Sequence, residues 1–271
     1  MNPRHFQIIV SCLLLFVVVA ACSLSPASPT TASTAAPAGA TSAPAATNPP
    51  VSASSGGGCS NAYFPVSVGT NWAYSSSGST LGAYTYTWTV ADVSNTGFTT
   101  NNQYSTGVST SIKWNCQNGN LAALDAGSTS LSVTNSSSTF KMTSNSITAD
   151  GYNIPNTFDT GTTWSEKVTV NGTVQSGTKS ANSQIVSDVS CSAAGSESVT
   201  VPAGTFDTVK ATCNQTLGVS FLMQGTPVPA GAPDTVSITD WYAKGVGLVK
   251  SVRASSLSST ETIVLTGYKV Q

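Results

Sequence analysis

Apolar and polar residues alternate along much of the chain, and this alternation predicts β-strands. In residues 83–90, "AYTYTWTV", Tyr84, Tyr86 and Trp88 fall on one face and threonines on the other. A strict period of two, with aromatic and β-branched residues, is typical of a strand with one buried face. Residues 111–116, "SIKWNC", alternate in the same way. Gly and Ser interrupt every candidate helix, so the sequence predicts an all-β fold with little helix.

Short turn motifs between these segments predict an antiparallel sheet built from hairpins. Asn171-Gly172 and Asn118-Gly119 each supply the two residues of positive φ that a type I′ turn requires. Pro202-Ala203-Gly204 fits a tight turn, because proline fixes φ and glycine accepts a positive φ. Gly245 and Gly247 suit a further turn before an apolar strand.

One short pattern occurs twice. Gly69-Thr70-Asn71-Trp72 and Gly161-Thr162-Thr163-Trp164 both follow a proline, Pro65 and Pro155 respectively, and both open a predicted strand. Two interpretations stay open at this point. The pattern marks two half-units, each with a Trp that fills one end of the core, or it reflects coincidental turn chemistry.

The N-terminal segment 1–21 has the features of a secretory signal peptide. Arg4 supplies a positive start, and the apolar run that follows is about 15 residues long, too short to span a membrane as a helix. Val19-Ala20-Ala21-Cys22 resembles the lipobox of bacterial lipoproteins. The resemblance implies cleavage before Cys22 and attachment of diacylglycerol and a further acyl chain such as palmitate to that residue. The alternative is an ordinary signal peptide with an incidental cysteine.

Residues 22–58 are expected to tether a folded domain to the membrane. After Cys22 this segment contains no charged and no aromatic residue and is rich in Ser, Thr, Ala and Pro. Such a composition cannot bury enough apolar surface to offset the entropy of ordering, which predicts a disordered spacer. Two acyl chains give stable anchoring, so we expect a location at the cell membrane, on its extracytoplasmic face. The remaining residues, 59–271, suit one β-rich domain.

The four cysteines of this domain predict two disulfides, as expected for an exported protein. If Val201 pairs with Thr205 across the Pro202 turn, residues near 193 face Cys213, within one bulge of Cys191. The prediction is therefore Cys191–Cys213, which leaves Cys59–Cys116. A zinc site made of four thiolates is the alternative, but no CxxC spacing is present.

Composition argues against several function classes. The whole chain carries 10 basic and 11 acidic residues and has no basic patch, so nucleic acid is not an expected partner. The single histidine, His5, lies in the signal segment, which excludes a Ser-His-Asp or Cys-His site in the mature protein. No cofactor or metal is expected. The oligomeric state is not predicted.

A hydrolase that uses two carboxyl groups is the enzymatic alternative. The acidic residues are scattered along the predicted strands and turns, and Asp207 and Glu197 are the pair that could meet across a hairpin. Exposed positions on strands are the preferred explanation for both residues, and we expect no catalytic activity. The scattered acids include Asp92, Glu166, Asp188, Glu197, Asp207 and Asp240.

The aromatic stripe Tyr84, Tyr86 and Trp88 admits two interpretations. The three rings could form an exposed platform on which sugar rings stack, as in carbohydrate-binding modules. The same stripe is also what a sheet buries in its core, and this is the preferred interpretation. The threonine face would then be the one in contact with solvent.

Three segments, 63–74, 199–213 and 241–251, resemble the marks of TapB-like bacterial lipoproteins and exported proteins in order and spacing. The resemblance implies an exported domain with a curved, partly open or barrel-like sheet similar to lipoprotein-carrier folds. It assigns no catalytic residue. The sequence therefore predicts a membrane-anchored lipoprotein with a non-enzymatic binding or envelope-structural domain, whose ligand is a lipid, a cell-surface polysaccharide or neither.

Overall fold

The computed structural model describes residues 57–80, 82–125, 132–134, 139–176, 179–257 and 259–271. All of them belong to the second of the two units into which the chain divides, Pro44–Gln271. The predicted signal peptide (1–21), the lipidation site Cys22 and all but the last two residues of the tether lie outside the described residues. No helix within the described ranges is long and apolar enough to cross a membrane.

The described chain is almost entirely β-structure, which confirms the predicted all-β class. It begins with one short 3-10 turn, η1 (Gly57–Cys59), and continues in strands that pair into one sheet. The strands are β1 (Asn71–Ser77), β2 (Tyr84–Val93), β3 (Gly97–Tyr104), β4 (Ser109–Gln117), β5 (Asn120–Ala123), β6 (Ser132–Thr134), β7 (Thr139–Gly151), β8 (Thr163–Ser176), β9 (Lys179–Val201), β10 (Gly204–Met223), β11 (Thr226–Pro229), β12 (Asp234–Ala243), β13 (Gly247–Ser255) and β14 (Thr260–Lys269).

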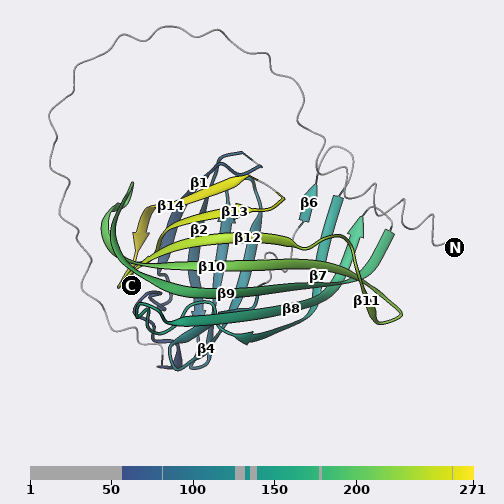
Figure 1. Ribbon diagram of the computed structural model, residues 1–271, viewed down its shortest axis with the longest axis horizontal. Helices are drawn as coiled ribbons and strands as arrows, with labels where there is room; N and C mark the ends of the chain where they lie inside the picture. The colour runs from purple at the N-terminus through teal and green to yellow at the C-terminus, as the bar shows by residue number, and fades with distance from the viewer. Residues whose placement is uncertain (1–56, 81, 126–131, 135–138, 177–178, 258) are drawn as a thin grey trace, which may run out of the picture. The chain divides into compact units, whose positions relative to one another are not determined.

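The sheet curls into a nearly closed barrel (Figure 1). Its strand order is β5-β4-β3-β2-β1-β14-β13-β12-β10-β9-β8-β7-β6, with β11 paired to β10, and the neighbours are antiparallel. Leu121 of β5 bridges Ile154, which follows β7, through backbone hydrogen bonds of 2.9 and 3.1 Å. This bridge satisfies backbone groups at the edge strand β5, which would otherwise be open to pairing with another chain.

Two strands, β9 and β10, are much longer than the others, and together with β8 they run past the barrel. β8, β9 and β10 contain 14, 23 and 20 residues, and Figure 1 shows them continuing toward β7 and β11. A second, smaller apolar cluster lies on this extension, around Val168 and Val170 of β8. The main core lies inside the ring.

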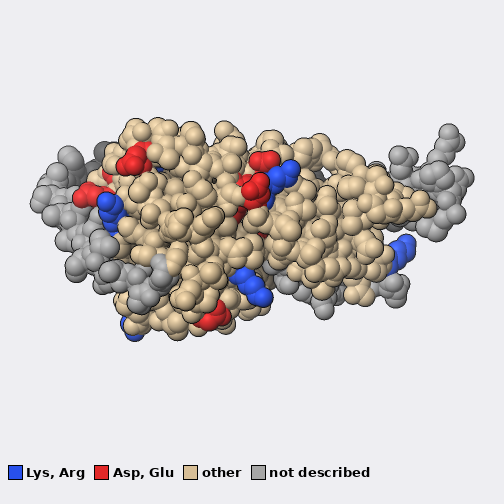
Figure 2. Space-filling model, turned by 90° about the horizontal axis from the view of Figure 1, so that it is seen from below, with Lys and Arg blue, Asp and Glu red and all other residues tan. Residues whose placement is uncertain are grey.

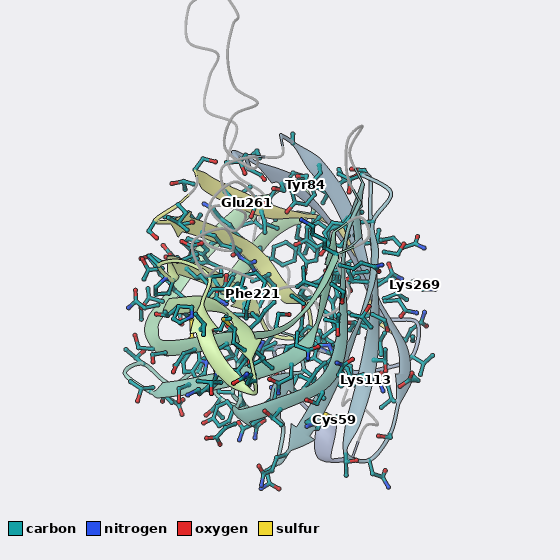
Figure 3. The ribbon with its side chains drawn as sticks, turned by 90° about the vertical axis from the view of Figure 1, so that its right-hand side faces the viewer. Cys59, Tyr84, Lys113, Phe221, Glu261 and Lys269 are labelled. Carbon is teal, nitrogen blue, oxygen red and sulfur yellow. A yellow bond between two sulfur atoms is a disulfide. The ribbon has the colours of Figure 1, made fainter. Side chains whose placement is uncertain are left out.

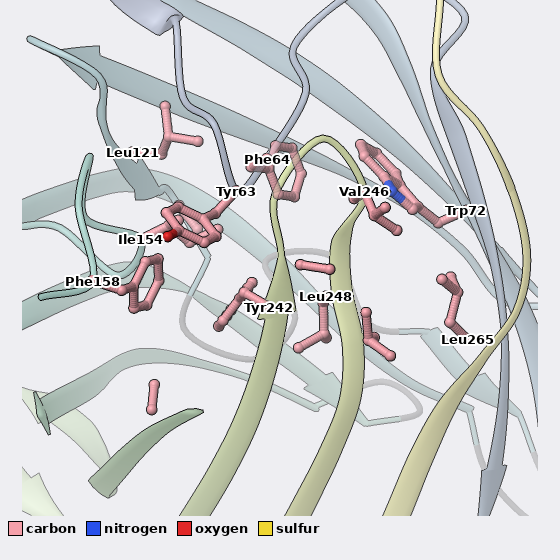
Figure 4. Close-up of a cluster of buried hydrophobic side chains, with 14 of the residues drawn as sticks. Tyr63, Phe64, Trp72, Leu121, Ile154, Phe158, Tyr242, Val246, Leu248 and Leu265 are labelled. Carbon is pink, nitrogen blue, oxygen red and sulfur yellow. Dashed lines mark hydrogen bonds between the residues drawn. The ribbon is translucent and has the colours of Figure 1, made fainter. Parts of the chain in front are cut away.

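One end of the ring is filled by the segment that enters the domain (Figure 4). Tyr63 and Phe64 pack among Phe158, Trp72 and Leu121 inside the barrel. This plug is also held by polar contacts. The buried amide of Asn61 donates to the carbonyls of Gly119 and Pro155 at 2.7 and 3.0 Å and accepts from the Tyr63 backbone amide at 2.8 Å.

The recurrent Gly-Thr-x-Trp pattern forms the same turn at both of its positions. Gly69 and Gly161 have φ of 86° and 85°, in the left-handed region that favours glycine. The amide of the following threonine donates to the carbonyl three residues earlier in each case, and the threonine carbonyl accepts from a neighbouring strand. Trp72 and Trp164 are buried, and each indole donates to a loop carbonyl. The pattern is therefore a structural repeat.

The turn predictions succeed with one exception. Asn118 and Gly119 both have positive φ and connect β4 to β5. Asn171-Gly172, in contrast, lies within β8, so the hairpin predicted there is wrong. Gly172 pairs with β7 on one side and β9 on the other. A Cβ at this position would clash with the Thr143 carbonyl, so the glycine permits close approach of β7 next to a bulge rather than a reversal of the chain.

The structure contains two disulfides, Cys59–Cys116 and Cys191–Cys213, and this pairing matches the predicted one. The first joins the plug to β4 and the second joins β9 to β10. The hairpin register differs from the expected one, because Val201 pairs with Gly204 rather than Thr205. A shift near Lys210 then brings Cys213 directly opposite Cys191.

Candidate functional site: an inner polar layer

The aromatic stripe of β2 faces the inside of the barrel. Tyr86 is buried, Tyr84 and Trp88 are half-buried against the core, and Thr85 and Thr87 are exposed. The exposed sugar-stacking platform is therefore not formed on the outer surface, and the preferred core interpretation agrees with the structure. The physical reason is the period of two, which sends the whole stripe to the face that the curled sheet encloses.

Inside the barrel, these rings meet a set of polar groups from other strands that we call the inner polar layer. Its side chains point to the same inner face of the sheet as the core residues. Figure 3 shows Tyr84 and Glu261 near each other and far from Cys59. The layer consists of Ser76, Tyr84, Tyr86, Trp88, Asn102, Tyr104, Glu166, Asp240, Tyr242, Ser251, Arg253 and Glu261.

Arg253 is the cation of this layer. Its Nε donates to the buried hydroxyl of Ser251 at 3.2 Å. In the register of β13 and β14, Arg253 lies directly opposite Glu261. Burial alone would lower the pKa of Arg253, but the charge of Asp240 and the nearby Tyr86 and Glu261 raise it above the ordinary value. Burial raises the pKa of Asp240. One guanidinium therefore balances carboxyl groups on the inner face of the barrel.

Glu261 organises the end of the layer that reaches solvent. Its Oε1 accepts hydrogen bonds from the hydroxyls of Ser76 and Tyr84 at 2.5 and 2.6 Å. Burial, followed by the hydrogen bond to Glu261, raises the pKa of Tyr84 to about 12. Tyr84 is therefore a donor at neutral pH, and it holds the carboxylate in a fixed position.

Glu166 stands on the opposite wall of the barrel, on β8, and only 4% of its surface is exposed. Burial raises its pKa to about 8, against a smaller lowering effect of the Ala123 backbone amide. The nearby Asp125 raises the pKa further. Glu166 is therefore mostly protonated and neutral at pH 7.

Two buried polar atoms of the layer, Oδ1 of Asn102 and Oε1 of Glu166, have no hydrogen-bond partner in the part of the chain that the structure describes. The Trp88 indole hydrogen-bonds the Tyr104 hydroxyl, and the Asp240 carboxyl interacts with Ser251 and Tyr242. Asn102 is only 1% exposed. A buried polar atom left without a partner costs about 1–3 kcal/mol, so such atoms in a folded protein call for an explanation.

The carboxyl pair considered for a hydrolase is not assembled. Glu197 pairs with Thr208, whereas Asp207 pairs with Ser198, so the two side chains project from opposite faces of the hairpin. Glu197 instead accepts a hydrogen bond of 2.5 Å from the Trp241 indole, and this bond, ahead of Lys210, lowers its pKa. Most of the described surface in the view of Figure 2 carries neither basic nor acidic side chains.

No group of three or more metal-ligating His, Cys, Asp or Glu side chains occurs within the described ranges. The cysteines are all in disulfides there, so the four-thiolate zinc alternative is wrong.

Sequence reasoning named Glu166 and Asp240 only as scattered acids and did not single out seven further members of the layer: Ser76, Asn102, Tyr104, Tyr242, Ser251, Arg253 and Glu261. A signal existed. In 163–170, "TWSEKVTV", Glu166 shares its parity with Trp164 and the buried valines, and in 237–243, "SITDWYA", Asp240 shares its parity with Ile238 and Tyr242. A charged residue in the buried register of a strand is the pattern that pointed to this site.

The family model described as DUF3108-like matches residues 83–254, well over half of the chain. The chain belongs to the DUF3108-like family. The finer resemblance to TapB-like proteins stays a prediction.

No curated protein matches the chain. Two solved structures are similar to it, both with a TM-score of 0.45, and each match covers 77% of this chain and 99% of the other. One, 12% identical, is a protein of Bacteroides fragilis inferred to be exported and assigned a YmcC-like fold. The other, 18% identical, is an inferred lipoprotein of Parabacteroides distasonis.

Proposed function

We propose that this protein is an exported lipoprotein, anchored to the membrane through Cys22, whose barrel binds a ligand at the inner polar layer without catalysis. The observation that carries the binding role is the presence of two buried oxygen atoms without partners among the described residues, Oδ1 of Asn102 and Oε1 of Glu166. Their desolvation cost is recovered when a ligand supplies the missing hydrogen bonds, and a role limited to packing gives no reason to keep them.

The proposed location outside the cytoplasm is supported by the sequence and by the disulfides. The lipobox-like residues before Cys22 and the uncharged tether support anchoring at the extracytoplasmic face. Two disulfides are typical of proteins that fold in an oxidising compartment. The described chain enters the barrel at its plugged end, so the tether attaches far from Tyr84 and Glu261 (Figure 3).

A purely binding role is supported by the chemistry of the layer. Asp240 and Glu261 are held by Arg253 and Tyr84, and the hydrolase pair Asp207 and Glu197 is split between two faces. Groups fixed in this way suit recognition of a molecule more than transfer of a proton.

Native mass spectrometry tests the proposal. The protein would be made with an ordinary cleavable secretion signal in place of residues 1–22, exposed to a total lipid extract and to a digest of envelope polysaccharide, and measured under native and denaturing conditions. We expect an adduct that is present only in the native spectrum, on a protein that lacks two hydrogens per disulfide. A bare protein under both exposures would contradict a binding role.

A further inference from the structure

The hairpin of β10 and β11 projects beyond the barrel and exposes apolar side chains. Figure 1 shows β11 at the far end of the long strands. Val219 and Met223 of β10 and Val228 of β11 are 39%, 49% and 42% exposed. Phe221, labelled in Figure 3, pairs directly with Val228 and is half-buried. Because residues two apart on a strand share a face, these four side chains form one apolar surface, which we call the hairpin face.

The hairpin carries no charge. The sequence has no Asp, Glu, Lys or Arg from 211 to 233. Asp234, which ends this run, pairs with Leu217, before the pairing of β10 with β11 begins. The neighbouring strand β9 is also uncharged from 180 to 187, where it pairs with this end of β10. Exposed apolar residues usually occur singly, whereas a cluster of them without charges marks an interaction surface.

The free edge of β11 lacks backbone donors at two positions. The Ala230 amide donates to the Val219 carbonyl at 2.8 Å, toward β10. Strand alternation then directs the nitrogens of Pro227 and Pro229 away from β10, and a proline nitrogen carries no hydrogen. This edge is therefore poorly suited to pairing with a strand of another chain. It also lacks the unpaired donors that would be costly in apolar surroundings.

These features favour lipid over protein as the partner of the hairpin face. Leu222 and Pro227 pair on the opposite side of the same hairpin, so apolar groups line both of its sides. A protein partner would cover one side, and its contacts normally include hydrogen bonds at a polar rim. The interface of a bilayer surrounds a narrow projection on both sides and takes up apolar groups to a shallow depth.

The chain outside the described residues is long enough to bring this hairpin to the membrane. Residues 23–56 separate the proposed anchor, Cys22, from the described chain. An extended segment of this length spans at most about 110 Å. Even the longest strand, β9 with 23 residues, is shorter, at about 76 Å if straight. Attachment at the plugged end of the barrel therefore does not prevent contact by the hairpin.

We propose that the β10–β11 hairpin is a second membrane contact, which inserts the hairpin face into the interface of a lipid bilayer. The inference rests on the exported location in the proposed function but not on the inner polar layer or its ligand. The exposed area is small, so without the anchor the contact is weak, with half-saturation on the order of millimolar lipid. A protein without its anchor therefore still leaves the membrane fraction when cells are broken and diluted.

Flotation with lipid vesicles tests the proposal. The mature chain from Ser23 onward is secreted without Cys22 and mixed with increasing amounts of phosphatidylcholine vesicles. We expect binding to these uncharged vesicles, because burial of apolar groups drives the contact. Binding should be no stronger on vesicles that contain phosphatidylglycerol and no stronger at low salt, since the hairpin has no charge to be screened.

The chain offers a matched pair of exposed valines. Val228→Asp forces a charge into the interface and should weaken vesicle binding at least about tenfold. Val68→Asp makes the same change in the turn before β1, at a valine that is 59% exposed, and should leave binding unchanged. Melting curves identify a variant that fails to fold. In that case Met223→Ser, beside the turn of the hairpin, takes its place and should weaken binding several-fold.

Each outcome bears on the hairpin separately from the ligand. Absence of vesicle binding by the folded wild type overturns this inference and leaves the ligand-binding role to mass spectrometry. Binding only to phosphatidylglycerol vesicles at low salt overturns it too, because charges elsewhere would then make the contact. Equal losses in Val228→Asp and Val68→Asp remove the hairpin as the site. A dimer in sedimentation velocity that Val228→Asp dissociates, without vesicle binding, assigns the hairpin face to a second copy of the chain.

Discussion

Glu166 illustrates at the scale of one residue how the barrel changes the chemistry of its side chains. Its carboxyl would be ionised at neutral pH in water, but burial raises the pKa from 4.5 to about 8. Between these two values the folded protein holds a proton that the unfolded chain has lost. Stability must therefore fall as the pH rises through this window, and it levels off above the folded-state pKa.

This gives a prediction for Glu166→Gln. In the wild type, the free energy of unfolding should fall by up to about 1.4 kcal/mol per pH unit between roughly pH 5 and 8 because of Glu166. Glutamine cannot ionise, so this fall should be absent from the variant. Urea unfolding of both proteins at several pH values measures the two slopes. Asp188→Asn, which changes an exposed carboxyl on the neighbouring strand, should retain the wild-type slope. Identical slopes for wild type and Glu166→Gln would contradict the buried, neutral state.

At the scale of elements, the two disulfides act on different parts of the fold. Cys59–Cys116 closes a separation of 57 residues and fixes the N-terminal plug to β4. Cys191–Cys213 closes only 22 residues within the β9–β10 hairpin, which is also held by a long ladder of backbone hydrogen bonds. Loop closure restricts the unfolded chain more when the loop is long.

Removal of the first disulfide should therefore cost more stability than removal of the second. By the loop-closure argument, Cys59→Ala/Cys116→Ala loses about 4 kcal/mol and Cys191→Ala/Cys213→Ala about 3 kcal/mol. Denaturant unfolding of both double variants under the same conditions checks this order. An equal or reversed order would show that the plug is held mainly by Asn61 and the aromatic packing rather than by its cross-link.

At the scale of the whole molecule, the described barrel and the N-terminal segment have different predicted roles. In the barrel, the Leu121–Ile154 bridge provides hydrogen bonds for the backbone of the edge strand β5, and the curled sheet encloses the inner polar layer. Residues 1–56, which are outside the described ranges, contain the predicted signal peptide and lipidation site. If the lipobox interpretation is right, membrane attachment depends on one side chain, the thiol of Cys22.

The anchor prediction can be tested without disturbing the barrel. With an ordinary cleavable signal in place of residues 1–21 and Cys22→Ser, the protein should move from the membrane fraction to the soluble fraction. The unaltered chain and Cys12→Ser, a change inside the signal segment, should stay with the membrane. Cell fractionation with metabolic labelling by a palmitate analogue measures both attachment and acylation. Retention of the Cys22→Ser protein in the membrane fraction would refute a lipid anchor at this residue.

Local rules were sufficient for much of the fold. Period-two alternation predicted the strands and the inward face of β2, and Asn118-Gly119 predicted a turn because that dipeptide favours positive φ wherever it stands. The same rule failed at Asn171-Gly172, where pairing with β7 and β9 on both sides outweighs the local preference for reversal. The alternation of inward and outward positions along β8 and β12 would also have placed the side chains of Glu166 and Asp240 inside the barrel.

The sequence by itself thus determined the β class, the faces of the strands and the Cys191–Cys213 pairing, because each depends on neighbours along the chain or across one hairpin. Cys59–Cys116 then followed as the remaining pair. Only the tertiary structure decided that Trp88, Asn102, Asp240 and Arg253 share one layer. These residues are up to 165 positions apart, and strand alternation says which face a side chain takes but not which strands meet. The curling of the sheet encloses that face, and burial then raises the pKa of Glu166 and leaves Oδ1 of Asn102 and Oε1 of Glu166 without partners among the described residues.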